Sequence, residues 1–145
     1  MPPKSGPDSN DQPAPAATQR AVVCVADASV AVQDGVQRLL QPLGAEVRRY
    51  GTAAALLADL AADAAPVAIV ADTHLPDLAG LELLRELDRR GLKVPTILLT
   101  AEADVTSAVS LMRAGAVDYI EKPHIDRALL GHLRHLLPGA SPGRR

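Results

Sequence analysis

The chain has 145 residues, of which 48% are hydrophobic and none is Phe or Trp, so it can form one domain with an aliphatic core. Its formal net charge of −2 gives no electrostatic reason to expect binding to nucleic acid or to a membrane surface. No apolar run approaches the roughly 20 residues of a membrane-spanning helix, and the N-terminus has no apolar signal core, so a cytoplasmic protein is expected.

Composition divides the chain into three parts. Residues 1–19 consist mainly of Pro, Ser, Gln, Asp and Ala, and residues 138–145 are rich in Pro and Gly. Both segments are predicted to be disordered tails, because they cannot bury enough apolar surface to offset the entropy cost of ordering. The folded body is therefore expected over residues 20–137.

Short apolar runs, typical of buried strands, alternate with helical periods through this body. Strands are predicted, in chain order, at residues 21–26, 46–50, 67–71, 94–99 and 117–120. Helical periods follow the strands, at residues 32–40, 53–60, 77–90, 105–112 and 129–137. Thr52 and Asp126 stand where their side chains could cap the second and the fifth helix. Cys24 lies inside the first strand and is expected in the core.

Strict alternation of five strands and five helices predicts an α/β fold, with a parallel sheet covered on both faces. Right-handed crossovers leave few topologies for such a chain. A flavodoxin-like (βα)5 doubly wound sheet with strand order 2-1-3-4-5 suits this size. In folds of this kind, ligands bind beyond the carboxyl ends of the strands.

Four polar residues follow the predicted strands at that edge. Asp27 follows the first strand and Asp72 the third, while Thr100 and Lys122 follow the fourth and the fifth. Each residue alone has an ordinary explanation as a helix cap, a turn residue or a solvated charge. Together they indicate one site, because an acid pair, a hydroxyl and an amine would meet on one rim.

Four segments around these positions carry a family resemblance. They are Val25-Ala-Asp27, Asp72-Thr-His-Leu-Pro76-Asp-Leu-Ala-Gly80, Pro95-Thr-Ile-Leu-Leu-Thr100-Ala101 and Ala114-Gly-Ala-Val-Asp-Tyr119-Ile-Glu-Lys122-Pro123. Asp72 and Thr100 are 28 residues apart, and Thr100 and Lys122 are 22 apart. The set closely resembles the receiver domain of bacterial two-component response regulators, in particular those of nitrogen-fixation regulators, over about residues 20–137.

The resemblance implies a phosphoacceptor rather than an enzyme, with at most slow removal of its own phosphoryl group. Asp72 matches the aspartate that accepts a phosphoryl group from a sensor histidine kinase or a phosphotransfer protein. The ligands of the Mg²⁺ ion that assists the transfer match the carboxylates of Asp27 and Asp72 and the backbone carbonyl of His74.

The resemblance also implies a read-out. Lys122 would hold one phosphoryl oxygen, and Thr100 would bind another with help from the Ala101 N–H. Tyr119 would follow Thr100 inward and remodel the face formed by the fourth helix, the fifth strand and the fifth helix.

Ala26 departs from the family, because relatives usually carry two adjacent acids at the end of the first strand. With Asp27 alone, weaker Mg²⁺ binding and slower phosphorylation are expected. The chain also ends eight residues after Leu137, which favours a stand-alone receiver that acts through protein contacts and binds no DNA. Three outputs stay open: binding an unidentified downstream protein, forming a homodimer through the helix 4–strand 5–helix 5 face, or drawing phosphate from a shared kinase.

Other functions fit less well. A degenerate receiver, acting as a binding or dimerisation module without phosphorylation, is the main alternative, and Ala26 motivates it. A hydrolase of the haloacid-dehalogenase type would need a second acid where this chain has His74. A dinucleotide-binding enzyme would need a Gly-rich turn after the first strand, which is absent. His132 and His135 on the last helix are expected to be partly exposed rather than to bind a metal.

Overall fold

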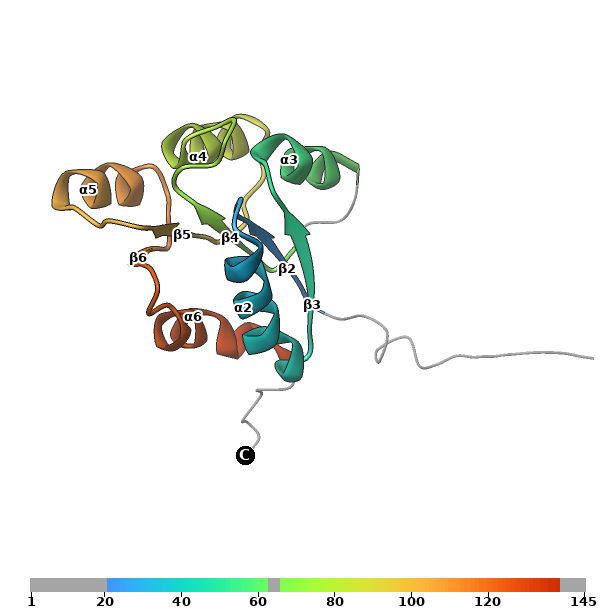
Figure 1. Ribbon diagram of the computed structural model, residues 1–145. Helices are drawn as coiled ribbons and strands as arrows, with labels where there is room; N and C mark the ends of the chain where they lie inside the picture. The colour runs from blue at the N-terminus through green and yellow to red at the C-terminus, as the bar shows by residue number, and fades with distance from the viewer. Residues whose placement is uncertain (1–20, 63–65, 139–145) are drawn as a thin grey trace, which may run out of the picture.

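Five short strands, each followed by a helix, make up the part of the chain that this computed structural model describes, residues 21–62 and 66–138 (Figure 1). The strands are β2 (Ala21–Ala26), β3 (Ala45–Tyr50), β4 (Ala68–Asp72), β5 (Thr96–Thr100) and β6 (Asp118–Glu121). All pairs are parallel, in the order β3-β2-β4-β5-β6. This is the predicted order 2-1-3-4-5, with the charged strand β3 at one edge. The predicted N-terminal tail lies outside the described residues, as does the predicted C-terminal tail after Pro138.

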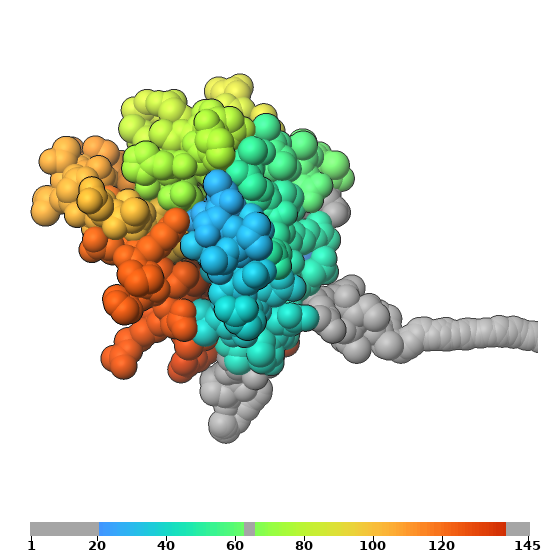
Figure 2. All heavy atoms as spheres, in the orientation of Figure 1, coloured from blue at the N-terminus to red at the C-terminus, as the bar shows by residue number. Residues whose placement is uncertain are grey.

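Helices cover both faces of the sheet, as Figure 1 shows. They are α2 (Val30–Leu40), α3 (Ala53–Ala62), α4 (Gly80–Arg89), α5 (Val105–Arg113) and α6 (Asp126–Leu133), with short 3₁₀ helices η1 (Gln41–Leu43) and η2 (Arg134–Leu136). α2 and α6 lie on one face and α3, α4 and α5 on the other. In the space-filling view α2 occupies the centre of the visible face, and α5 lies at its margin (Figure 2). None of the helices within the described ranges is long and apolar enough to cross a membrane.

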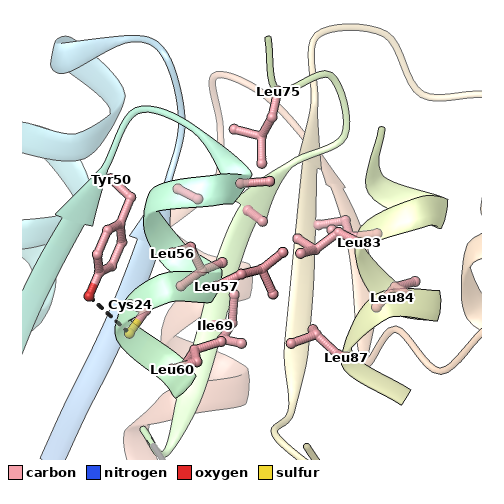
Figure 3. Packing of buried hydrophobic residues seen from close by; sticks show 14 of the residues in the cluster. Cys24, Tyr50, Leu56, Leu57, Leu60, Ile69, Leu75, Leu83, Leu84 and Leu87 are labelled. Carbon is pink, nitrogen blue, oxygen red and sulfur yellow. Dashed lines mark hydrogen bonds between the residues drawn. The ribbon is translucent and has the colours of Figure 1, made fainter. Parts of the chain in front are cut away.

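Neighbouring residues along each strand supply two separate aliphatic cores, because side chains alternate between the faces of a sheet. Ile69 and Leu98 face the core under α3 and α4, whereas Val70 and Leu99 face the core under α2 and α6. Figure 3 shows the first of these cores, with leucines of α3 and α4 packed over the sheet. Cys24 belongs to it at 2% exposure, and burial raises the pKa of its thiol, so the sequence prediction of a core cysteine is confirmed.

The start of α3 depends on two side chains from different parts of the chain. Thr52 caps α3 as predicted, because its Oγ1 accepts a hydrogen bond from the Ala55 N–H at 3.1 Å. Asp77 adds a second cap, since its carboxylate accepts bonds from the N–H groups of Ala53 and Ala54, both at 2.9 Å. These bonds lower the pKa of the Asp77 carboxyl. Asp77 therefore belongs to the loop before α4, and the prediction that a helix begins there is wrong by three residues.

The last helix also differs from the sequence prediction. Ile125 occupies the N-cap position of α6, and Asp126 is the first helical residue with no capping bond from its side chain. The prediction of Asp126 as the cap is therefore wrong. Ile125 takes the preceding position because its side chain is buried in the core under α2 and α6. Asp126 still places a negative charge near the positive end of the helix.

Two helical glycines differ in the space around them, which predicts opposite effects of alanine. A Cβ added at Gly80 would lie 3.2 Å from the Thr73 Cα, whereas a Cβ added at Gly35, inside α2, would meet nothing within 4 Å. Gly35→Ala should raise the free energy of unfolding by about 1 kcal/mol, because alanine loses less backbone entropy in a helix. Gly80→Ala should lower it by roughly 1 kcal/mol, because the backbone of Thr73 must move. Urea denaturation of both variants checks the difference, and equal effects would contradict it.

Candidate functional site

The strand register brings the four predicted polar residues to one edge of the sheet. The paired ends of β2 and β4 place Asp27 beside Asp72. The paired ends of β5 and β6 place Thr100 beside Lys122, whose backbone N–H donates to the Thr100 carbonyl at 2.8 Å. The positions follow from the backbone alone, because parallel strands end at the same side of a sheet.

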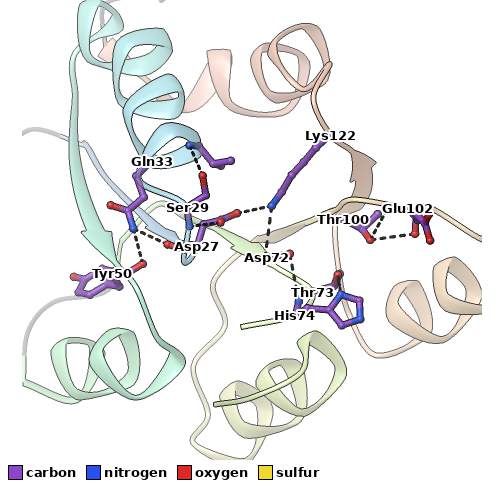
Figure 4. A network of polar contacts seen from close by, with 11 residues as sticks. Asp27, Ser29, Gln33, Tyr50, Asp72, Thr73, His74, Thr100, Glu102 and Lys122 are labelled. Carbon is purple, nitrogen blue, oxygen red and sulfur yellow. Dashed lines mark hydrogen bonds and ion pairs between the residues drawn. The ribbon is translucent and has the colours of Figure 1, made fainter. Parts of the chain in front are cut away.

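One ammonium group bridges the two carboxylates (Figure 4). The Lys122 Nζ lies 2.8 Å from the Asp27 Oδ2 and 3.6 Å from the Asp72 Oδ2. The side chains of Lys122, Asp72 and Asp27 are 19%, 15% and 2% exposed, respectively. A carboxylate as buried as that of Asp27 needs a counter-charge, and Lys122 supplies it.

The second oxygen of each carboxylate is oriented by the main chain. The Asp27 Oδ1 accepts a hydrogen bond from the Ser29 N–H at 2.9 Å, and the Asp72 Oδ1 accepts one from the His74 N–H at 3.3 Å. Both Oδ2 atoms therefore turn toward one shared cation, the Lys122 ammonium. Each carboxylate thus has a partner at both of its oxygens.

This oxygen arrangement fits a hard divalent cation. Carboxylate and carbonyl oxygens are the protein ligands that Mg²⁺ prefers. Asp27 and Asp72 could hold such an ion together with a main-chain oxygen such as that of His74. Within residues 21–62 and 66–138, no group of three or more His, Cys, Asp or Glu side chains is placed to hold a metal ion. A cation at this edge would therefore depend on main-chain oxygen as well as on the two carboxylates.

The hydroxyl groups of Thr100 and Tyr119 both bond to the backbone carbonyl of Glu102, and neither bonds to Asp72. The Thr100 hydroxyl, in a residue that is 2% exposed, donates to the Glu102 carbonyl at 3.1 Å and accepts from the Glu102 N–H at 3.3 Å. It points away from Asp72 in Figure 4. The Tyr119 hydroxyl donates to the same Glu102 carbonyl at 3.5 Å. Ala101 follows Thr100 in the chain and is exposed.

A cleft of about 630 Å³ opens beside these hydroxyls, between α4 and α5. Its lining includes Thr100, Glu102 and Tyr119 on one side, and Thr73, His74 and Leu81 on the other. The His74 ring is fixed at its mouth by a 3.0 Å hydrogen bond between its Nδ1 and the Thr73 Oγ1. The cleft gives the Thr100 and Tyr119 side chains room to change position.

Sequence reasoning missed two polar contacts, one beside this edge and one at the opposite end of β6. The buried amide of Gln33 bonds to the backbone of Asp27, and a polar residue between apolar positions of a helix was its only signal. His132 is partly exposed, as predicted, but its Nε2 lies 2.7 Å from the Asp118 Oδ2. No pattern in the sequence pairs these two residues, because they lie 14 positions apart on β6 and α6.

Five parallel strands with an acid pair and a lysine at their carboxyl edge define the receiver type of flavodoxin-like fold. A response regulator receiver protein from Pseudoalteromonas atlantica has this fold, with a TM-score of 0.71 and 30% identity over 79% of this chain and 95% of that one. The BeF3-activated DrrB receiver domain matches with a TM-score of 0.69 and 30% identity, over 81% of this chain and 97% of that one.

Sequence comparison identifies the family. The response regulator receiver domain matches residues 23–134, and the chain belongs to this family. The transcriptional regulatory protein FixJ of Azorhizobium caulinodans is 38% identical over 124 residues, which cover 85% of this chain and 58% of the relative. FixJ of Rhizobium meliloti is 37% identical over 108 residues, which cover 74% of this chain and 52% of the relative. The chain thus spans about half the length of the curated relatives it matches.

Membership has general consequences for chemistry. Receiver domains of two-component systems are phosphoacceptors rather than typical enzymes, and they interact with histidine kinases or phosphotransfer proteins. They generally bind Mg²⁺ at the site of phosphorylation. The carboxylates of Asp27 and Asp72 at the carboxyl edge of the sheet fit a phosphoacceptor and a Mg²⁺ site.

Proposed function

We propose that Asp72 accepts a phosphoryl group from a histidine kinase or a phosphotransfer protein, and that the domain signals through protein contacts. The observation that carries this proposal is the ion cluster of Asp27, Lys122 and Asp72. Only one of its two carboxylates is accessible: the Asp72 side chain is 15% exposed, whereas that of Asp27 is 2% exposed. An incoming phosphorus atom can therefore reach Asp72, while Asp27 is suited to hold a cation.

In the proposed transfer an oxygen of Asp72 attacks phosphorus and forms an acyl phosphate bond. The phosphorus–nitrogen bond of the donor histidine breaks, and its electron pair stays on the imidazole, which takes up a proton. Such transfers depend mainly on positioning and on neutralising charge. Mg²⁺ held by Asp27, Asp72 and the His74 carbonyl would supply positive charge, and the Lys122 ammonium would pair with a phosphoryl oxygen.

The read-out would begin at Thr100. If its hydroxyl turns to a phosphoryl oxygen, with help from the Ala101 N–H, it gives up its bond to the Glu102 carbonyl. Tyr119 donates to the same carbonyl, so the change would reach the Tyr119 side chain and the adjoining cleft. This shared carbonyl supports a two-state change that a new charge at Asp72 would bias.

The proposed surface for protein contact, including contact with a second copy of the chain, is the face of α5, β6 and α6. These elements are the fourth helix, the fifth strand and the fifth helix of the sequence prediction. Val105, Val109 and Met112 lie on α5 at intervals of four and three residues and are 79%, 43% and 44% exposed. Residues with this spacing share one side of a helix, so they form an apolar stripe. An exposed stripe of this kind is typical of interaction surfaces.

Phosphorylation from a small donor tests the proposal without the unidentified kinase. Incubation with acetyl phosphate or phosphoramidate and Mg²⁺ should increase the intact mass by one phosphoryl group. The alternative, a degenerate receiver that binds or dimerises without phosphorylation, predicts no mass change with either donor. Ala26 is the residue that favours this alternative.

Ala26→Asp should strengthen Mg²⁺ binding, because it adds a carboxylate beside Asp27. Ala26 is fully buried in the core under α3 and α4, so the new carboxylate should also lower the melting temperature of the metal-free protein. Titration calorimetry should therefore give a smaller dissociation constant for Mg²⁺, and Mg²⁺ should raise the melting temperature more than in the wild type. Equal affinities in the two proteins would contradict the idea that Ala26 weakens the metal site.

A further inference from the structure

Gln33 is a buried polar residue on α2, 8% exposed, next to Asp27 of the ion cluster. Its Nε2 donates to the Asp27 carbonyl at 2.6 Å and to the Tyr50 carbonyl at 3.2 Å (Figure 4). Both N–H groups of the amide are thus used on main-chain oxygens at the ends of β2 and β3. The first bond is the shorter one, and it ends on a residue of the proposed metal site.

Arg49 on β3 fixes which way this amide points. Its Nε donates to the Gln33 Oε1 at 3.1 Å. A flipped amide would turn the Gln33 N–H groups against the Arg49 N–H, so both ends of the side chain require the same orientation. The rest of the guanidinium is held by α2, through Gln37 Oε1 at 2.8 Å and Asp34 Oδ1 at 2.6 Å.

The bond from Gln33 completes the support of Asp27. β2 ends at Ala26, so Asp27 lies one residue beyond the strand. The Asp27 N–H donates to the Tyr50 carbonyl at 2.9 Å, and its side-chain Oδ1 accepts from Ser29. Its carbonyl oxygen is held by Gln33. Because position 26 is alanine, Asp27 is the one carboxylate at the end of this strand, and its placement alone decides what β2 contributes to a cation site.

We propose that Gln33 is a positioning residue for Asp27 in the Mg²⁺ site, and that Arg49 sets the orientation of Gln33. Substitution of a group that orients a metal ligand typically lowers metal affinity by about 10- to 100-fold. The inference rests on the proposed function, since it assumes that Asp27 binds Mg²⁺. It goes further by assigning a role to a buried amide that contacts neither the phosphoryl group nor the ion.

Replacing Gln33 by Leu or by Glu, whose side chains are similar in size, removes the N–H groups that bond to the main chain. Gln33→Leu leaves the Asp27 carbonyl without its bond, and Gln33→Glu places an oxygen against that carbonyl while keeping the contact with Arg49. Each should raise the Mg²⁺ dissociation constant, measured by titration calorimetry, by about tenfold. The Mg²⁺ concentration for half-maximal phosphorylation by acetyl phosphate should rise in parallel, with little change in the rate at saturating Mg²⁺. A purely structural role would lower that maximal rate as well.

Gln37→Ala is the matched control, because Gln37 does not contact Asp27 and the Asp34 carboxylate still holds the Arg49 guanidinium without it. It should leave the dissociation constant unchanged. Arg49→Met, at a side chain that is 31% exposed, should raise it by a smaller factor than Gln33→Leu, and it decides the question if the Gln33 variants do not fold.

The inference is overturned if folded Gln33 or Arg49 variants bind Mg²⁺ as the wild type does, or if Gln37→Ala weakens binding equally. It is also overturned if the wild type binds no Mg²⁺. Binding of Mg²⁺ needs no phosphoryl transfer, so a wild type that binds the ion but gains no phosphoryl group overturns the proposed function alone.

Discussion

Asp72→Asn should abolish the gain of a phosphoryl group from acetyl phosphate, because an amide is not a nucleophile for phosphorus. The fold should stay intact. The Lys122 ammonium is 3.6 Å from Asp72 but 2.8 Å from Asp27, so the closer ion pair survives the substitution. Asp72 is also the more exposed of the two acids, and an amide there leaves no unpaired buried charge. Intact-mass spectrometry checks the first expectation, and circular dichroism with thermal melting checks the second.

Asp88→Asn gives a matched control for Asp72→Asn, because Asp88 is an exposed acid on α4. It should take up one phosphoryl group as the wild type does. A mass gain that persists in Asp72→Asn would place the acceptor elsewhere. Gross unfolding of Asp72→Asn would mean instead that Asp72 is mainly structural.

The strand order and the edge that carries the site could be predicted because both depend on local patterns. Five apolar runs separated by helical periods leave few arrangements for a parallel sheet. Once those runs are strands, the residues after them must share one edge, so Asp27, Asp72, Thr100 and Lys122 could be placed together without coordinates. No knowledge of side-chain orientation is needed for that step.

Side-chain partners far apart in the chain could not be predicted. The Asp77 side chain caps α3, which lies 24 residues earlier in the chain. Asp77 is therefore part of the loop before α4, and the helix begins at Gly80 rather than at Asp77 as predicted. Gln33 on α2 bonds to the main chain at Asp27 and Tyr50, beside the ends of two strands. In each case the deciding contact joins elements whose relative placement only the folded sheet defines.

Lys122→Met should destabilise the metal-free protein strongly. Asp27 is 1% exposed, and its Oδ2 lies 2.8 Å from the Lys122 Nζ, so the substitution leaves a buried carboxylate without its counter-charge. Loss of one partner of a buried pair typically costs 3–5 kcal/mol, and we expect a decrease of about 3 kcal/mol in the free energy of unfolding. Chemical denaturation in the presence of a chelator measures it. Lys93→Met, at an exposed lysine, should change that free energy by less than about 0.5 kcal/mol.

Added Mg²⁺ should restore much of the lost stability of Lys122→Met. A ligand that binds only the folded state stabilises it by about 2.7 kcal/mol at a hundred times its dissociation constant. In the wild type the ion must compete with the ammonium for the Oδ2 atoms of Asp27 and Asp72, and in the variant it need not. Mg²⁺ should therefore bind the variant more tightly and raise its melting temperature more, although phosphorylation should be slower without the ammonium. If Mg²⁺ stabilised both proteins equally, the carboxylates that Lys122 bridges would not be the ones that hold the ion.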